Sequence, residues 1–381
     1  MSESVVEGKC KLSTENGDGC SKHVSNGVPH VMFLTDTNCS NTNSAVLETT
    51  EEAASNNKED LYAHLSFRTE GKDLVRLTDN SKCDGNSTDC RNGDIVEEGE
   101  DFLANVRESE LTYREYCVRN KGETSSEVTC IATTRHDCQM IVCDHLNGTI
   151  NLVDKQFNVV FKYHSCFKAF GVAVLDASFF VVTFPLVRLM QYYKFKDSFS
   201  KFAPWFPVKA QNEYYGVCGT GDRIVAVCKY DGDNRKDTPS VHILNRQGNV
   251  LSIITKDANG KQLFVDPEFI AINNASRAVY VSDSGAGAIV CLNLAGEVLS
   301  IFSSRNFLPT GIAIDDSIGV VYVNDVHSES VISFNRELEA VQKIKAQREK
   351  LTALLCATYC IKSDRLILSM KKSFYLKAFT L

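Results

Sequence analysis

The sequence lacks several signatures that would narrow its function at once. Among 381 residues it has no Cys-x2-Cys pair, only one tryptophan and no long apolar run. Zinc-binding cysteine modules need paired cysteines at short spacing, so we expect none. A transmembrane helix needs about 20 consecutive apolar residues, which no segment supplies. Residues 1–30 also lack a basic start followed by an apolar block, so we expect no secretory signal.

Acidic residues dominate the first quarter of the chain. Residues 1–101 contain 20 Asp and Glu against 9 Lys and Arg, and only three of the 35 aromatic residues. A segment this acidic and poor in aromatic residues cannot offset its ordering entropy by burial. We therefore expect residues 1–105 to be an acidic, mostly disordered tail and residues 106–381 to be the folded domain.

The cysteine count indicates a compartment. Fifteen cysteines form an odd number, and in the absence of a secretory signal they favour the reducing cytosol, where thiols stay free. Most of those after residue 101 occupy apolar runs, where a free cysteine packs as a small core residue. We expect a cytoplasmic protein with no bound metal and no cofactor.

An internal repeat is the strongest pattern in the sequence. Residues 269–283 and 311–325 align without a gap at an offset of 42, and Pro267 and Pro309 precede them at the same offset. Weaker copies begin at residues 130, 171, 216 and 354, which gives six units spaced 41 to 53 residues apart. Self-similarity at this period is typical of repeat architectures.

Each unit predicts four short strands. The first two are continuous apolar runs, as expected of buried strands, and the last two alternate apolar with polar residues. Four strands per 40–50 residues indicate a β-propeller blade. The predicted fold is therefore all-β: a six-bladed β-propeller of four-stranded antiparallel blades behind a disordered N-terminal tail.

Closure of this ring requires a fourth strand for the last blade. The last unit supplies only three strands before Leu381, and an open ring would leave a bare strand edge. The segment 111–118 precedes the first unit and has strand-like composition, so we predict that it completes the last blade. Residues 338–355 also fit a helical period, but the repeat offset places a fourth strand at 338–344, and we follow the repeat.

The two clearest units resemble NHL repeats, with an apolar strand after proline and a second strand ending in Val-Tyr-Val-x-Asp. An apolar strand and a glycine turn follow. Such propellers are similar to the C-terminal domains of tripartite-motif (TRIM-NHL) ubiquitin ligases. Those proteins carry a RING, B-boxes and a coiled coil upstream, which this sequence lacks. The resemblance therefore implies a substrate-recognition domain without ligase activity in this chain.

Six-bladed propellers also include calcium-dependent lactonases and esterases, which need several carboxylates at the channel mouth. Here Asp144, Asp283 and Asp325 end second strands, while other units hold different residue types at that place. Aspartate at such a position usually caps a turn by accepting backbone hydrogen bonds. We expect capping, assign no catalytic residue, and keep a metal-dependent hydrolase as the least favoured alternative.

Two sets of loops are expected to meet at one face of the propeller: those leading into the inner strands, and those joining second to third strands. Aromatic and cationic side chains there suit protein-binding hot spots. Alternatively, an aromatic residue at these places could simply pack one blade against the next. The candidate binding residues are Arg188, Trp205, Tyr214, Tyr215, Arg235, Phe269, Phe307, His327, Lys371 and Lys372.

These features favour a non-catalytic module that recognises a protein partner. Single-stranded RNA is the alternative ligand on the same face, because aromatic residues and cations also suit bases and phosphates. The whole chain is −7 and residues 1–101 are −11, so residues 102–381 carry +4, a modest charge for nucleic-acid binding. We expect no DNA and no membrane partner. The sequence does not specify an oligomeric state.

Overall fold

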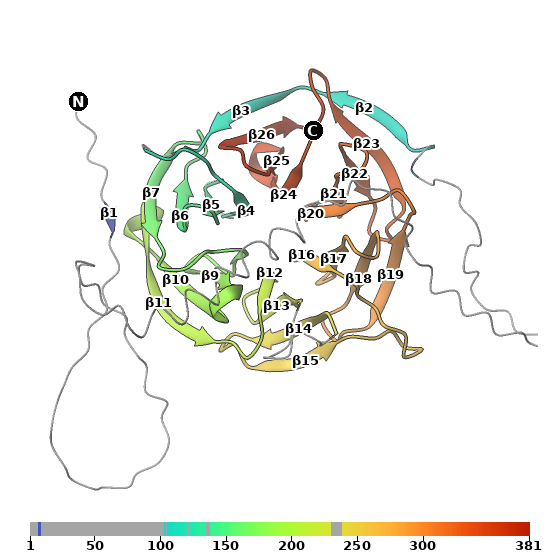
Figure 1. Ribbon diagram of the computed structural model, residues 1–381, viewed down its shortest axis with the longest axis horizontal. Helices are drawn as coiled ribbons and strands as arrows, with labels where there is room; N and C mark the ends of the chain where they lie inside the picture. Colours follow the sequence, from blue (N-terminus) through green and yellow to red (C-terminus); the bar gives the residue numbers. More distant parts are fainter. Residues whose placement is uncertain (1–6, 9–102, 104, 120–121, 135–137, 230–237) are drawn as a thin grey trace, which may run out of the picture. The chain divides into compact units, whose positions relative to one another are not determined.

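Six sheets arranged in a ring make up the described protein (Figure 1). The computed structural model describes residues 7–8, 103, 105–119, 122–134, 138–229 and 238–381. The ring confirms the predicted all-β, six-bladed propeller. The predicted disordered tail falls almost entirely outside the described residues, and the domain boundary at residue 105 stays a prediction.

Each blade contains four antiparallel strands, which are listed here from the centre of the ring outward. Blades 1 to 3 comprise β4 (Val128–Thr133), β5 (Met140–Asp144), β6 (Thr149–Val153) and β7 (Val159–His164); β8 (Val172–Val174), β9 (Phe179–Phe184), β10 (Leu189–Lys196) and β11 (Lys201–Lys209); and β12 (Tyr214–Gly219), β13 (Arg223–Cys228), β14 (Ser240–Asn245) and β15 (Val250–Ile254). Blades 4 to 6 comprise β16 (Pro267–Ile272), β17 (Val279–Asp283), β18 (Ala288–Leu292) and β19 (Val298–Ser303); β20 (Pro309–Asp315), β21 (Val320–Asp325), β22 (Ser330–Phe334) and β23 (Ala340–Ala346); and β24 (Leu354–Cys360), β25 (Arg365–Met370), β26 (Tyr375–Thr380) and β3 (Tyr113–Cys117).

Helical structure is confined to single turns in the part of the chain that the structure describes. These turns are η1 (Pro185–Val187), η2 (Asp197–Phe199) and η3 (Ile361–Ser363). No helix of the described residues is long and apolar enough to cross a membrane. The stretch after Leu338, which also fits a helical period, contains strand β23, as the repeat offset predicts.

The core lies between neighbouring blades. Every residue of β6, β18 and β22 is buried, because the blades on either side cover both faces of these strands. Val241 of blade 3 and Val281 of blade 4, for example, belong to one buried cluster. The predicted half-solvated third strand is therefore wrong: polar residues such as Asn151 and Ser333 in these strands are buried together with their apolar neighbours.

The last blade is closed by a strand from the other end of the propeller. β3 pairs with β26 in antiparallel register, with Tyr113 opposite Phe379 and Cys117 opposite Tyr375. Figure 1 shows cyan β3 lying beside red β26. This confirms the predicted role of the segment 111–118.

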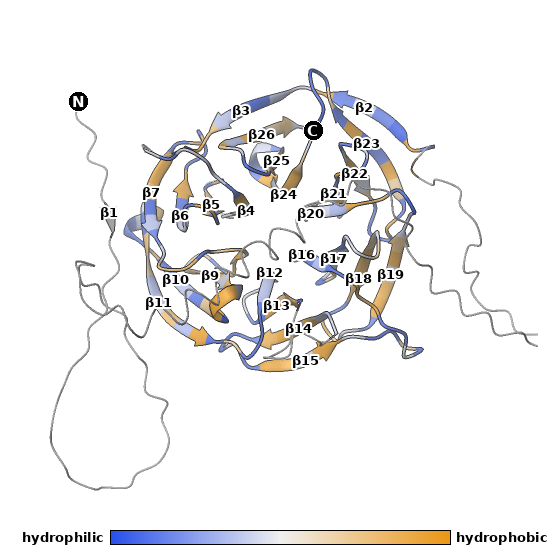
Figure 2. Ribbon diagram, viewed as in Figure 1, coloured by the Kyte–Doolittle hydropathy of each residue, from blue (hydrophilic) through white to orange (hydrophobic). Residues whose placement is uncertain are grey.

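Two further strands extend the outer edges of blades 1 and 5, which the sequence analysis did not predict. β2 (Arg107–Leu111) pairs in parallel with β23, and the two-residue β1 (Glu7–Gly8) pairs in parallel with β7. Figure 2 shows that β2 is mostly hydrophilic, so it carries no apolar pattern that would reveal a strand. Its Glu108 instead forms an ion pair with Lys345 at 2.7 Å.

Candidate functional site

The loops that enter first strands and those that join second to third strands lie at the same end of every blade. We call this end the crossover face, and the opposite end the turn face. Aspartates that end second strands tie the two loop types together. Asp283 accepts hydrogen bonds from the backbone N–H of Val265 at 2.7 Å and of Ala286 at 2.9 Å, one from each loop. Asp144 and Asp325 do the same in blades 1 and 5.

These contacts confirm the capping role predicted for the three aspartates. The Asp283 side chain is fully buried, which raises the pKa of its carboxyl, while the backbone N–H donors act against that shift. Its oxygens point at backbone N–H groups of its own blade. In the part of the chain that the structure describes, no group of three or more His, Cys, Asp or Glu side chains could hold a metal ion.

Four of the candidate aromatic residues are buried at the seams between blades. Tyr214 and Tyr215 lie in β12, Phe269 lies in β16, and Phe307 lies in the loop before β20. The structure thus corrects the prediction that the first three lie in loops. The Tyr214 hydroxyl, for example, lies 2.9 Å from His242 Nδ1 within blade 3. All four side chains pack blades together, since burying a large ring removes much apolar area from water.

The centre of the ring is narrow at the crossover face. The rings of Tyr215 and Phe269 pack around Phe170, with centroid distances of 5.1 and 6.1 Å. Neighbouring inner strands also approach backbone to backbone here. A Cβ atom on Gly216 would lie 2.3 Å from the carbonyl oxygen of Glu268, so only glycine fits.

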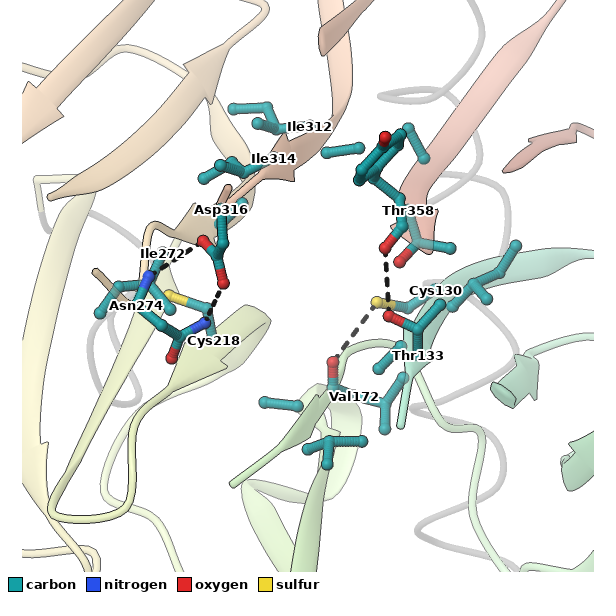
Figure 3. A pocket seen from close by; sticks show the side chains of 18 of the residues that line it. Cys130, Thr133, Val172, Cys218, Ile272, Asn274, Ile312, Ile314, Asp316 and Thr358 are labelled. Carbon is teal, nitrogen blue, oxygen red and sulfur yellow. Dashed lines mark hydrogen bonds between the residues drawn. The ribbon is translucent and has the colours of Figure 1, made fainter. Parts of the chain in front are cut away.

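A cavity of about 640 Å³ lies along the inner strands and extends to the turns of the turn face (Figure 3). Much of its wall is aliphatic and includes Val172, Ile272 and Ile314. A carboxylate on the wall is already engaged: Asp316 accepts hydrogen bonds from the backbone N–H and the side-chain amide of Asn274, at 3.0 and 2.8 Å. The cavity therefore offers mainly an apolar surface.

Four cysteines, Cys130, Cys218, Cys356 and Cys360, also line this cavity. Burial raises the pKa of the Cys130 thiol to about 11, and it raises the pKa of Cys218 and of Cys356 in the same direction. These thiols stay protonated near neutral pH and are poor nucleophiles, because the thiolate is the reactive form.

Four of the candidate polar residues lie on the crossover face. Arg188 follows η1, His327 follows β21, and Lys371 and Lys372 follow β25. His327 and Lys372 are exposed, and the other two are half-buried. Lys371 and Lys372 flank the buried Glu127, whose carboxyl pKa is raised because burial outweighs the pull of these positive charges.

Trp205 does not lie on the crossover face, so its predicted location in a loop was wrong. It lies in the middle of β11, the outermost strand of blade 2, and 51% of its surface is exposed. The repeat spacing placed Trp205 in a loop leading into an inner strand, but the chain forms an outer strand here, which tolerates Pro204 and Pro207 because its outward N–H groups need no partner in the sheet. Arg235 lies outside the described residues.

An exposed apolar patch on the crossover face escaped the candidate set. Leu186 and Val187 of η1 are 49% and 41% exposed, and Phe167 in the preceding crossover loop is 38% exposed. The Phe167 ring contacts Phe184, which directly precedes η1, at a centroid distance of 6.3 Å. We call Phe167, Leu186 and Val187 the crossover patch. The sequence did contain a signal for this patch: in two short loops, the exposed apolar residues are followed directly by a basic residue, Lys168 or Arg188.

Comparisons with known proteins support the fold. No family model and no curated protein matches the sequence. The WD40 repeats of RRP9 are similar with a TM-score of 0.52 at 10% identity, over 72% of this chain and 99% of that one. U3-55K gives 0.51 at 10% identity, over 70% and 98%. A selenomethionine-substituted virginiamycin B lyase from Staphylococcus aureus gives 0.51 at 12% identity, over 71% and 100%.

At such low identities the likeness shows a β-propeller fold and nothing more. The similar structures include WD40 repeats as well as a lyase. Propellers support many unrelated functions, so the function of this chain has to be argued from its own surface.

Proposed function

We propose that this chain is a non-catalytic interaction module whose propeller binds a protein partner through the crossover patch. The observation that carries the proposal is the joint exposure of Phe167, Leu186 and Val187 on one face. Removing such apolar area from water is the main favourable term in most protein association. Phe167 packs against Phe184, and the backbone N–H of Arg188 donates to the Pro185 carbonyl, so both patch loops are held in place and little ordering entropy opposes binding.

The chemistry around the patch fits a protein ligand. Lys168 and Arg188 directly follow the patch residues in the chain, and both are half-buried. An apolar centre with a polar, charged rim is the usual anatomy of a protein interface. An acidic or polar rim on the partner would complement these two cations.

We further propose that the propeller is of the NHL type and acts as the substrate-recognition part of a TRIM-type, ubiquitin-ligase-related protein in the cytoplasm. Support comes from the 42-residue offset between its two clearest units and from their shared Val-Tyr-Val-x-Asp ending. The final aspartates of these endings, Asp283 and Asp325, hold equivalent loops in the two blades.

Binding of single-stranded RNA is the second candidate function, and one observation favours it. Lys168, Lys371 and Lys372 all lie close enough to Glu127 to act on the pKa of its carboxyl, so three cations gather on the crossover face. Phosphates would be drawn to such a group, and binding would weaken steeply with salt.

Variants of the patch separate these proposals. The full chain is used to capture partners from cell extract, with and without ribonuclease, and is compared with Leu186→Asp and Val187→Asp. Leu251→Asp is the matched control, because Leu251 is 52% exposed on β15, away from the crossover face. We expect both patch variants, but not the control, to lose the same protein in ribonuclease-treated extract.

The opposite results are equally clear. If both patch variants still capture the protein, the crossover patch is not its binding site. Capture that disappears with ribonuclease, and falls in Lys371→Gln and Lys372→Gln, would replace the protein partner with RNA.

A further inference from the structure

A second pocket lies away from the crossover patch, where blades 2 and 3 meet. It has a volume of about 490 Å³ and is open to solvent along Trp205. Its aromatic residues come from three strands of blade 2, and its charged residues come from the turns before β9 and after β14. These residues are Phe179, Tyr192, Trp205 and Phe206, with Asp176 and Arg246. We call it the seam pocket.

The local sequence explains why the aromatic floor is fixed. The pairing of β10 with β11 shifts register between Gln191 and Tyr193. Such an irregularity bends a strand and re-aims its side chains. Tyr192 at this place stacks on Phe206 with a centroid distance of 4.2 Å, and its hydroxyl donates a hydrogen bond of 2.6 Å to the carbonyl of Arg246. The floor is therefore ordered before any ligand arrives.

Cations lie over the aromatic rings of the seam pocket. The Lys194 ammonium lies 5.1 Å from the ring centroid of Trp205 and 5.7 Å from that of Phe179. The guanidinium of Arg246 lies 5.4 Å from the centroid of Phe179. The pocket thus presents positive charge directly beside apolar surface, and it would repel a cationic guest.

Positive charges outnumber negative charges around the seam pocket. Asp176, which lines the pocket, forms an ion pair with Arg246, and Asp197 forms one with Lys201. Lys194, Lys196 and Lys209 of β10 and β11 form no ion pair with another residue in the described part of the chain. Blade 2 therefore has an excess of positive charge around the seam pocket.

We propose that the seam pocket binds an acidic, extended peptide segment of a protein partner. An apolar side chain of the peptide lies against Trp205 and Phe206, one flanking carboxylate pairs with Lys194, and another shares Arg246 with Asp176. Charge complementarity decides against a basic peptide. A stacked nucleobase is disfavoured because cations already lie over the faces of Trp205 and Phe179. This site is separate from the crossover patch and does not depend on it.

The chain carries its own reporter for this site. Trp205 is the only tryptophan in 381 residues, so all tryptophan emission comes from the seam pocket. The full chain is first applied to an array of capped heptapeptides in which Asp or Glu alternates with apolar residues. A matched array has Lys in place of every acid. The strongest peptide of either array is then titrated against the full chain while Trp205 emission is followed.

We expect acidic peptides to be retained and to change the emission of Trp205 saturably. Lys194→Gln and Arg246→Gln should each weaken binding about tenfold, the usual loss when a hydrogen bond to a charged group is removed. Lys201→Gln is the matched control on β11, because Lys201 pairs with Asp197 outside the pocket, and it should leave the affinity unchanged. Leu186→Asp should also leave it unchanged, which separates this site from the crossover patch.

Three results would overturn the proposal. One is the absence of any acidic peptide that changes Trp205 emission, and another is equal binding of the Lys-substituted peptides. The third is a response of Trp205 to a ten-residue oligouridine but to no peptide, which would make RNA the ligand. Unchanged melting temperatures of Lys194→Gln and Arg246→Gln exclude unfolding as the reason for lost binding.

Discussion

Tyr113 and Phe379 pair across the last blade and join the two ends of the described propeller. Their rings also pack, with a centroid distance of 5.3 Å. Beside them the ammonium of Lys377 lies 4.0 Å from the Tyr113 ring centroid and 2.8 Å from a Glu115 oxygen, although the Lys377 side chain is only 1% exposed. The closing strand thus completes the sheet and also supplies partners for a buried cation.

Substitution of Lys377 tests this closing contact. Lys377→Ala removes the buried stem and the contacts of its ammonium with Tyr113, Glu115 and Glu349, and we expect a loss of about 2–4 kcal/mol in the free energy of unfolding. Lys377→Met keeps most of the volume and removes the cost of burying a charge, so we expect a change within about 1 kcal/mol. Urea unfolding measures both. Equal losses in the two variants would show that charge, and not packing, dominates at this position.

The close approach of the inner strands predicts a second effect. Gly216→Ala would place a methyl group 2.3 Å from the Glu268 carbonyl oxygen, so blades 3 and 4 must separate. Overpacking of this kind costs about 1–3 kcal/mol of stability. Gly221→Ala is the control, because no heavy atom lies within 4 Å of its added Cβ, and we expect a change within about 0.5 kcal/mol. A Gly216→Ala protein as stable as the control would contradict the described contact.

His145 predicts a pH dependence of stability. Its Nδ1–H donates to the Ala169 carbonyl at 3.1 Å, and burial lowers its pKa below the usual 6.5. The folded state therefore binds fewer protons than the unfolded state between the lowered pKa and 6.5. Stability contributed by neutral His145 is present above pH 6.5 and is lost as pH falls through the lowered pKa.

Melting temperatures between pH 7.5 and 5 measure this effect. His145→Asn keeps a donor near the Ala169 carbonyl and cannot titrate, so it should flatten the decline on the acidic side. His327→Asn, at an exposed site on the same face, should leave the decline as in the parent protein. If the melting temperature of His145→Asn declines as in the parent protein, other titratable groups cause the decline.

The thiols of the central cavity should react slowly. A pKa of about 11 leaves Cys130 with about one hundredth of the thiolate that a thiol of pKa 9 has at pH 8. We therefore expect iodoacetamide to modify exposed Cys117 long before Cys130, Cys218 and Cys356 in the folded protein. Peptide mapping by mass spectrometry measures the order. Rapid modification of Cys130 would mean that the cavity activates its thiols.

Features set by local repetition could be predicted from the sequence. The 42-residue offset located the strands of blades 4 and 5, and the missing fourth strand of the last blade pointed to the segment 111–118. The aspartates that end second strands were recognised as caps, because this role depends on loops close in the chain. β2 could not be recognised, since its polar side chains reflect an exposed outer edge and not a buried face.

Features that depend on packing between blades could not be predicted. Tyr215 and Phe269 are aromatic residues of the kind found in exposed binding hot spots, but neighbouring blades cover them. The repeat spacing placed Trp205 in a loop, whereas it lies on the outer strand β11, which pairs with β10. For Tyr215 and Phe269 the deciding contacts come from a different blade, and nothing in the spacing along the chain records them.

Photocrosslinking from the crossover patch tests the central claim most directly. Benzoylphenylalanine is placed at Leu186 in the full chain, and at Leu251 on the outer edge of blade 3 as the control. We predict that irradiation in cell extract joins the Leu186 site, but not the control site, to one protein, and that ribonuclease leaves this adduct intact. Adducts that are equal at both sites, or that ribonuclease removes, would contradict protein recognition by the crossover face.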